Sequence, residues 1–280
     1  MTTVKLILLS MPIGNRQDLS SRAVETLREE TLFVAEDTRT LKSVFNWLEI
    51  SLTEKKIQSF HDHSQETQAK KMLEEIPPGE NLVYVSEAGS PVISDPGLPL
   101  VQAAIELGIE VTTIPGASAV IAALELSGLA PIPFHFHGFF PRDKRESALL
   151  NVTEIRGTHI YFESPKRIMK TLEVIADVLP AAKVVVAREL TKKFEEVYRF
   201  IAQDFSSIAE TITLKGEFVL LIQANLKEIK KVGGSKEAQE LAQNLIENGV
   251  SDKQLSKLLA TLVPDKSAKE IYKCLQSRKN

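Results

Sequence analysis

Short runs of apolar and β-branched residues alternate with longer amphipathic segments through the first 130 residues. The strand-like runs cover residues 4–9, 32–35, 81–85 and 110–113. Segments with apolar residues every three or four positions cover residues 19–29, 40–48, 66–76, 98–107 and 118–126. A repeated strand-then-helix order is typical of a mostly parallel sheet with helices on its faces. We therefore predict an N-terminal α/β domain over residues 1–130.

The pattern changes after the proline-rich stretch at residues 131–133. Strand-like runs then cover residues 134–139, 158–162, 183–187, 195–201 and 217–223, and helical segments cover residues 142–151, 168–178 and 204–210. Several of these strands are separated by too few residues for a crossover helix, which favours antiparallel pairing. We predict a second α/β domain over residues 131–226.

The last part of the chain has a different character. Residues 227–236 include two lysines followed by Val-Gly-Gly-Ser, a composition typical of a flexible linker. Residues 237–280 then contain three short helical segments, at 237–247, 252–261 and 266–276. We predict a small all-α appendage here, either an interaction module or a nucleic-acid-binding one.

Composition and charge narrow the class of protein. The 280 residues are 43% hydrophobic and 25% charged, which excludes a disordered chain. The net charge of −3 argues against a uniformly basic nucleic-acid binder. That charge is unevenly divided, because residues 227–280 hold 11 basic and 7 acidic residues, whereas residues 1–226 hold 23 and 30. The body is therefore acidic (−7), and the linker and appendage together are basic (+4), although a solvated lysine-rich surface would give the same count.

Cysteine and histidine usage bears on metals and compartment. Cys274 is the single cysteine, which excludes an intramolecular disulfide and a cysteine-based zinc site. The histidines form two pairs two residues apart, His61 with His63 and His135 with His137, without a compact third ligand. We therefore predict no metal site. The first apolar run is too short for a signal-peptide core, and no window has the apolar length of a membrane span. We expect a cytoplasmic protein.

Three irregular loops follow predicted strands of the first domain. The longest covers residues 85–97 (Val-Ser-Glu-Ala-Gly-Ser-Pro-Val-Ile-Ser-Asp-Pro-Gly), and the others cover residues 11–15 and 114–119. Ligands of α/β proteins bind outside the carboxyl ends of the strands, so these loops predict the walls of one pocket. None of them has the spacing of a phosphate-binding Walker loop or of the dinucleotide fingerprint.

Charged residues also gather just after strands. The clusters are Ala-Glu-Asp-Thr-Arg at 35–39, Glu-Ser-Pro-Lys-Arg at 163–167 and Ala-Arg-Glu-Leu-Thr-Lys at 187–192. A hydrophobic core does not need such clusters. They indicate either a reactive site or surface ion pairs of little energetic value.

Taken in order, these motifs resemble the ribosomal RNA small subunit methyltransferase I family, within the tetrapyrrole methylase superfamily. The resemblance runs over residues 6–223 and also includes Met-Pro-Ile-Gly-Asn at 11–15, Pro-Gly-Ala-Ser at 115–118 and Ser-Gly-Leu at 127–129. Where the superfamily's tetrapyrrole enzymes have Gly-x-Gly-Pro-Gly, this chain has residues 11–15, which favours RNA over a corrin precursor. The sequence departs from the family at Met11, Glu87, Ser90 and Lys166, where members usually have Thr, Asp, Thr and His.

The resemblance implies that S-adenosylmethionine (SAM) binds between two α/β domains of a homodimer. The expected acceptor is the ribose 2′-oxygen of a cytidine in the decoding centre of 16S rRNA, within the 30S subunit. The residues it implies around SAM, together with a glycine of the long loop, are Ile13, Gly89, Ser90, Ile93, Ser118, Ala119, Phe162 and Leu190.

The chemistry we expect is a single in-line displacement of the methyl group, which needs a proton acceptor or a cation near the attacking oxygen. Glu36, Asp37 and Glu189 are candidate acceptors, and Arg39 and Lys192 are candidate cations. Candidate RNA contacts are Lys166, Arg167 and Arg188. Two alternatives remain at this point: a SAM-dependent methylase of a tetrapyrrole or other small molecule, and a non-enzymatic RNA-binding or assembly protein.

Overall fold

The computed structural model describes residues 4–61, 66–224, 251, 253–256 and 269. The chain divides into two compact units, Met1–Glu228 and Ile229–Asn280, and both sheets described below belong to the first. The predicted linker at 227–236 lies outside the described residues. So does most of the predicted helical appendage at 237–280, of which residues 253–256 are helical.

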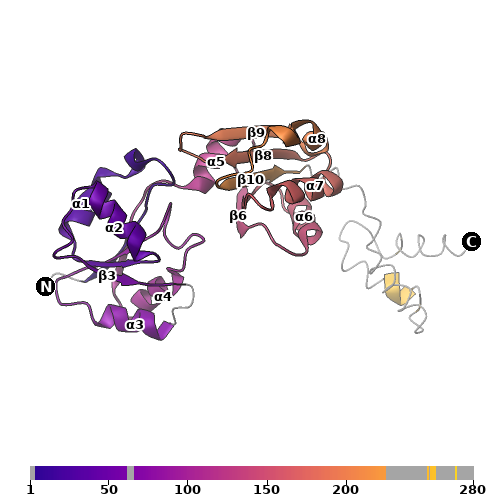
Figure 1. Ribbon diagram of the computed structural model, residues 1–280. Coiled ribbons are helices and arrows are strands. Elements are labelled where there is room, and N and C mark those ends of the chain that lie inside the picture. Colours follow the sequence, from indigo (N-terminus) through magenta and orange to yellow (C-terminus); the bar gives the residue numbers. More distant parts are fainter. Residues whose placement is uncertain (1–3, 62–65, 225–250, 252, 257–268, 270–280) are drawn as a thin grey trace, which may run out of the picture. The chain divides into compact units, whose positions relative to one another are not determined.

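The first sheet is entirely parallel, with strand order β3-β2-β4-β1-β5. Its strands are β1 (Lys5–Leu9), β2 (Leu32–Ala35), β3 (Lys56–Ser59), β4 (Leu82–Val85) and β5 (Glu110–Ile114). Helices α1 (Ser21–Glu29) and α2 (Thr38–Trp47) lie on one side of it, and α3 (Glu66–Glu74) and α4 (Leu98–Glu106) lie on the other (Figure 1).

Alternate side chains of these strands supply the two cores. Phe33 and Val83 pack with α1 and α2, whereas Val34 and Tyr84 pack with α3 and α4. A strand that is buried on both faces reads as a continuous apolar run rather than an alternating one. This explains why β2 and β4 could be recognised from sequence although they are short.

The second sheet is mixed, with strand order β6-β7-β10-β8-β9. Its strands are β6 (Phe134–Phe139), β7 (Thr158–Glu163), β8 (Lys183–Arg188), β9 (Glu196–Ile201) and β10 (Phe218–Gln223). Only β6 and β7 pair in parallel; β10 runs antiparallel to β7 and β8, and β9 is antiparallel to β8. The predicted antiparallel pairing in this half is therefore confirmed.

Helices cover both faces of the second sheet. Helices α6 (Arg145–Glu154), α7 (Ile168–Val178) and α8 (Phe205–Ile208) pack on one face. Helix α5 (Ala119–Ser127) packs on the other face, through Val120, Ala123 and Leu124. We placed α5 within the first domain by its position in the chain, but its apolar side chains contact the second sheet. Short 3-10 turns occur at Arg16–Asp18, Ala202–Asp204 and Ala209–Thr211.

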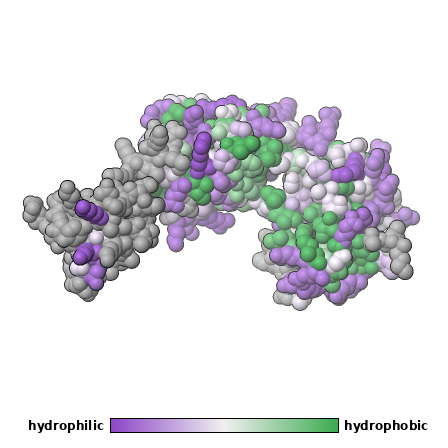
Figure 2. All heavy atoms as spheres, turned by 180° about the vertical axis from the view of Figure 1, so that it is seen from behind, coloured by the Kyte–Doolittle hydropathy of each residue, from purple (hydrophilic) through white to green (hydrophobic). Residues whose placement is uncertain are grey.

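Apolar side chains also reach the surface. Figure 2 shows apolar patches among polar residues on one face of the molecule. Exposed large apolar residues include Ile93, Ile105, Phe139 and Phe194. In the part of the chain that the structure describes, no helix is both long and apolar enough to cross a membrane.

Candidate functional site

The loops that follow β1, β2, β4 and β5 lie at one edge of the first sheet, because these strands are parallel. Two of the loops are joined by a pair of backbone hydrogen bonds, since Met11 and Gly89 each donate an N–H to the other's carbonyl at 2.9 Å. The Ser86 hydroxyl also donates to the Gly89 carbonyl at 2.7 Å. Gly89 has φ +69°, and a Cβ there would lie 3.3 Å from Ile13. A glycine is therefore required where the long loop approaches the first one.

A cavity of about 410 Å³ opens at this edge. Residues of both sheets and their loops form its walls: Ile13, Glu36, residues 87–90, residues 93–95, residues 118–120, Phe139, residues 162–165 and residues 216–219. This volume lies within the range of sites for small molecules and cofactors. The prediction that the glycine-bearing loops form walls of one pocket is confirmed.

The chemistry of the lining is apolar and acidic. Ile13, Ile93, Phe139, Phe162 and other apolar residues supply most of the surface. Five acidic residues are also among those that line the cavity, Glu36, Glu87, Asp95, Glu163 and Glu217, of which Glu163 pairs with Arg167 and Glu217 with Lys192. None of the described lining residues is lysine or arginine. Such a lining suits a ligand that combines a flat apolar ring with a positive centre, and it disfavours phosphate groups.

Seven of the eight residues expected around SAM line this cavity; the exception is Leu190. Its side chain is buried, in a core against which Ile13 packs. Leu190 thus supports a wall residue from behind. Ser118 caps α5 through its hydroxyl, which accepts from the Ile121 N–H. Ser118, Ala119 and Val120 line the cavity, so the first turn of this helix faces it.

The long loop holds an unusual backbone. Val92 and Ser94 have φ values of +72° and +62°, which side-chain-bearing residues rarely adopt. The Tyr84 hydroxyl donates to the Asp95 carboxylate, and a Cβ at Gly97 would lie 2.4 Å from the Tyr84 ring. The loop is therefore anchored to the end of β4 while its central residues are held in a strained conformation. Such strain gathers at ligand sites.

The charged cluster after β2 divides between the cavity and the surface. Glu36 lines the cavity, whereas Asp37 and Arg39 do not. Asp37 caps α2 and pairs with Arg39 at 2.7 Å. The side-chain hydrogen bond from Arg39 lowers the pKa of Asp37 to about 2. Asp37 is thus a poor proton acceptor in this arrangement, and the Arg39 side chain is 89% exposed.

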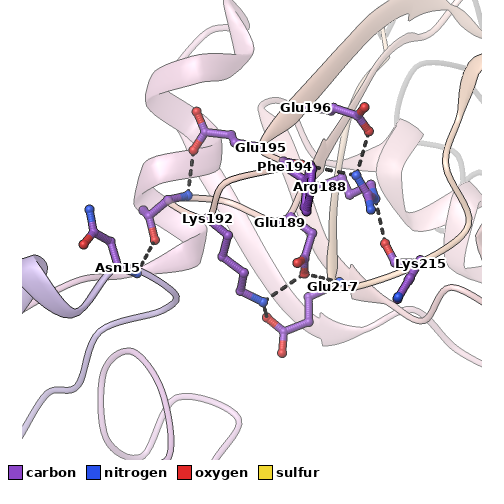
Figure 3. A network of polar contacts seen from close by, with 10 residues as sticks. Asn15, Arg188, Glu189, Lys192, Phe194, Glu195, Glu196, Lys215 and Glu217 are labelled. Atoms are coloured by element: carbon purple, nitrogen blue, oxygen red, sulfur yellow. Dashed lines mark hydrogen bonds and ion pairs between the residues drawn. The ribbon is translucent and has the colours of Figure 1, made fainter. Parts of the chain in front are cut away.

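The cluster after β8 forms a network with the loop before β10 (Figure 3). The Lys192 ammonium donates to Glu189 and to Glu217, both at 2.9 Å. The hydrogen bond from Lys192 lowers the pKa of Glu189. Burial opposes the charge of Lys192, but its hydrogen bonds to the two glutamates outweigh burial and raise its pKa. Glu217 lines the cavity, so Lys192 lies one hydrogen bond away from the cavity wall.

The loop that follows β8 also contacts the loop that follows β1. The Asn15 N–H donates to the Thr191 hydroxyl at 3.1 Å (Figure 3). A Cβ on Gly14 would lie 2.3 Å from Cγ of Lys192 and 3.0 Å from the Leu190 carbonyl. Glu189 and Thr191 both have positive φ values, +51° and +63°. A strained turn thus brings the Lys192 network against the first strand's loop.

The three candidate RNA contacts differ in position. Lys166 is exposed, beside the cavity residues Ser164 and Pro165. Arg167 pairs with the buried Glu163 at 2.5 Å. The Arg188 side chain is only 6% exposed, donating to the Lys215 and Phe194 carbonyls and pairing with Glu196. With Nε and Nη1 bonded inside the protein and an almost fully buried side chain, Arg188 stabilises the second sheet, and we do not expect it to contact RNA directly.

The histidines form a stacked group rather than a ligand set. The His137 and His159 rings stack at 5.2 Å, with a 2.9 Å hydrogen bond between them, and His135 lies 5.0 Å from His159. Burial lowers the pKa of both His137 and His159. Among the described residues, which include His61 but not His63, no group of three or more His, Cys, Asp or Glu could hold a metal ion.

Several cavity residues were not predicted from sequence. Glu163 belongs to the charged cluster at 163–167, in which we predicted a role only for the cations Lys166 and Arg167. Glu217 precedes β10, whose antiparallel direction brings its amino end to the cavity. No local signal marks Glu217, because strand order and direction are set by tertiary packing. Phe139 was predicted only as the last apolar residue of a strand, with no role in the cavity.

The chain resembles known proteins in both sequence and fold. Residues 5–205 match the family model described as Tetrapyrrole (Corrin/Porphyrin) Methylases. A protein of Halalkalibacterium halodurans named ribosomal RNA small subunit methyltransferase I is 40% identical over 227 residues, covering 80% of this chain and 78% of that protein. The Bacillus subtilis protein of that name is 34% identical over 275 residues, covering 95% and 93%.

Among solved structures, the uroporphyrin-III C-methyl transferase of Thermus thermophilus, complexed with S-adenosylhomocysteine, superposes with a TM-score of 0.52. It is 14% identical, covering 78% of this chain and 97% of that one, so this similarity shows the fold alone. The predicted fold class, a two-domain α/β fold like that of the tetrapyrrole methylases, is confirmed for the described residues.

Proposed function

The chain belongs to the tetrapyrrole (corrin/porphyrin) methylase family, and from this premise we propose that it transfers a methyl group from SAM to RNA of the small ribosomal subunit. The observation that carries the proposal is the 34–40% identity, over most of the chain, to proteins named ribosomal RNA small subunit methyltransferase I. In finer detail, we propose that the acceptor is the ribose 2′-oxygen of a decoding-centre cytidine in 16S rRNA.

The cavity fits the methyl donor. SAM carries a purine ring and a positively charged sulfur whose methyl group is transferred. Ile13, Ile93 and Phe162 offer apolar surface for the ring, while Glu87 offers negative charge to the cationic part. The first turn of α5, at Ser118 and Ala119, adds backbone N–H groups for an oxygen-bearing part of the donor.

The reaction we propose is one displacement, in which the bond from oxygen to the methyl carbon forms as the bond from that carbon to sulfur breaks. The hydroxyl proton passes to a carboxylate, and Glu36 is the predicted candidate that lines the cavity. Lys192 does not line the cavity, so in place of the predicted role of a cation at the acceptor oxygen we propose that its hydrogen bonds to Glu189 and Glu217 position the cavity wall. Orientation of the two reactants can supply roughly 7–11 kcal/mol of the acceleration.

The proposal extends to partners. Lys166 and Arg167 follow β7 at the edge of the cavity, and Lys166 offers an exposed cation for phosphates. We propose that the acceptor is presented within the 30S subunit, that the enzyme acts as a homodimer and that it works in the cytoplasm. The basic residues of the linker and appendage, at 227–280, would add contacts to RNA.

Methyl transfer from labelled SAM to three acceptor sets tests the function: 30S subunits, free 16S rRNA, and a panel of tetrapyrroles and other small molecules. We expect label in 16S rRNA at one cytidine, where 2′-O-methylation blocks alkaline cleavage of the backbone. Label in a small molecule alone would refute the RNA proposal. A chain that binds SAM without labelling any acceptor would favour a binding or assembly role.

Single variants separate the proposed roles. Glu36→Gln should slow transfer to 30S subunits with little change in SAM affinity, because its carboxylate is proposed to accept the hydroxyl proton. Lys192→Met should also slow transfer, because Glu217 in the cavity wall loses its hydrogen bond. Asp37→Asn and Arg39→Gln should have smaller effects, since this pair lies outside the cavity. Equal effects of all four changes would contradict the assignment of Glu36 and Lys192.

A further inference from the structure

Phe139 is an exposed aromatic residue at the wall of the cavity. Its side chain is 62% exposed, yet it belongs to the cavity lining. One edge of the ring contacts Phe162, with centroids 5.6 Å apart and planes at 69°. Phe162 packs in the same way against Phe136, at 4.9 Å and 62°. Phe139 is thus supported on one side and open to solvent on the other.

An irregularity in the backbone of β6 sets the direction of the Phe139 ring. The pairing of β6 with β7 is regular up to Phe136 and then shifts, so that Phe139 is opposite Phe162. Gly138, within this irregularity, has φ +71°. The strand is regained at once, because the Phe140 N–H donates to the Phe162 carbonyl at 2.8 Å. Irregularities of this kind redirect a side chain, here to the cavity.

Exposed cations follow the two strands that carry Phe139 and Phe162, whereas the charged residues that line the cavity are acidic. Because β6 and β7 are parallel, the segments after them lie at the same edge of the second sheet. These segments carry the exposed Arg142, Lys144 and Lys166, with Asp143 as an acidic neighbour. An RNA strand near this edge can place its phosphates on the outer cations, but not among the carboxylates of the cavity. The sugar and base of the acceptor nucleotide would therefore enter the cavity, while its phosphates stay outside.

From this arrangement we propose that Phe139 stacks on the base of the acceptor nucleotide and so turns its ribose toward the cavity. The inference rests on the proposed RNA methyltransferase function and adds a residue that selects and positions the acceptor. Proteins commonly bind single-stranded or extruded bases by stacking them on exposed aromatic rings. The open face of Phe139 provides such a platform, and Phe162 keeps the ring from turning away.

The test compares full-length variants by their affinity for purified, unmethylated 30S subunits, with S-adenosylhomocysteine present so that no turnover occurs. Phe139→Ala should weaken binding about tenfold or more, as expected when one stacking contact is lost. Phe139→Tyr, which keeps the ring, should bind like the wild type, whereas Phe139→Leu should not. In methylation assays Phe139→Ala should raise KM for 30S subunits, with SAM affinity unchanged.

Phe194 supplies the matched control. It is also 62% exposed and has Lys193 near its ring, but it does not line the cavity. Phe194→Ala should leave 30S affinity within about twofold of the wild type, since no stacking contact is removed. A comparable loss in both variants would mean that any exposed ring matters, which would overturn the proposal.

Other outcomes overturn the inference while leaving the function standing. If the wild type methylates rRNA and Phe139→Ala binds 30S subunits normally, only the stacking role fails. Weaker SAM binding in Phe139→Ala would place the ring against the donor, and a changed oligomeric state in sedimentation would place it against a second copy. If the wild type neither binds nor methylates 30S subunits, both proposals fail.

Discussion

Glu163 offers a sharp test of how the cavity wall is held. This carboxylate is completely buried at the end of β7. It accepts hydrogen bonds from the Ser164 N–H and the Thr171 hydroxyl, both at 2.7 Å, and it pairs with Arg167 at 2.5 Å. These contacts fix the turn that places Ser164 and Pro165 in the cavity wall. Substituting Glu163 therefore tests stability and ligand binding together.

The structure gives different costs for two substitutions. Glu163→Ala leaves the guanidinium of Arg167 without its buried partner and two further donors unsatisfied, so we expect a loss of about 3–5 kcal/mol in the free energy of unfolding. Glu163→Gln keeps a carbonyl oxygen for Ser164 and Arg167, and the Thr171 hydroxyl can rotate to accept from the new amide. Only the charge of the acceptor is lost, which should cost about 1–2 kcal/mol.

Urea unfolding, followed by circular dichroism, would measure these losses of stability. A fluorescence titration with SAM would measure the affinity for the donor. Both variants should also bind SAM more weakly, Ala more than Gln, because the turn at 164–165 loosens. Glu110→Ala is a matched control, since Glu110 pairs with Lys5 on the surface and should contribute less than about 1 kcal/mol. Equal stability of Glu163→Ala and Glu110→Ala would refute the reasoning.

Four further predictions follow from single features. Gly14→Val should displace Lys192 and slow methyl transfer on the order of tenfold or more without abolishing folding, as measured by single-turnover kinetics and thermal unfolding. The Asp37 carboxyl should titrate near pH 2 by NMR, so the stability from its ion pair is present above the ordinary aspartate range and is lost as the pH falls toward 2. Burial lowers the pKa of His159, so the unfolded chain binds more protons in mild acid; stability should fall below about pH 6.5, and His159→Gln should reduce that slope. A chain ending at residue 226 should bind 30S subunits more weakly and with a shallower salt dependence at unchanged SAM affinity; an unchanged slope would refute a role of the appendage in RNA binding.

The sequence predicted most elements of the first sheet because local and tertiary preferences agree there. Strand β2 was predicted with its observed bounds, and the helix that precedes it, α1, lies within the predicted range 19–29. Strand β3 was not predicted, because Lys56, Gln58 and Ser59 are exposed at the edge of the sheet and give no apolar pattern. An edge strand with one neighbour is specified by pairing with β2 rather than by burial.

The site was only partly predictable for a related reason. Parallel strands bring their carboxyl ends to one edge, so the loops holding Ile13, Gly89 and Ser118 could be assigned to one pocket before the structure was known. The contribution of Glu217 depends on an antiparallel strand, and that of Phe139 depends on an irregularity in β6. Neither is encoded by a local spacing. Arg188 was chosen as an RNA contact for its charge, but sequence does not reveal that its side chain is buried and that Nε and Nη1 bond inside the protein.

The net charge of −3 now has a structural interpretation. Within the described body of the chain, carboxylates line the cavity, and exposed cations such as Lys144 and Lys166 follow the strands beside it. An acidic cavity favours a cationic donor and repels phosphates, whereas cations outside it attract them. This separation of charge would admit the sugar and base of one nucleotide and hold its backbone outside. A protein with this arrangement needs few phosphate contacts near its cavity, so a near-neutral total charge is compatible with an RNA substrate.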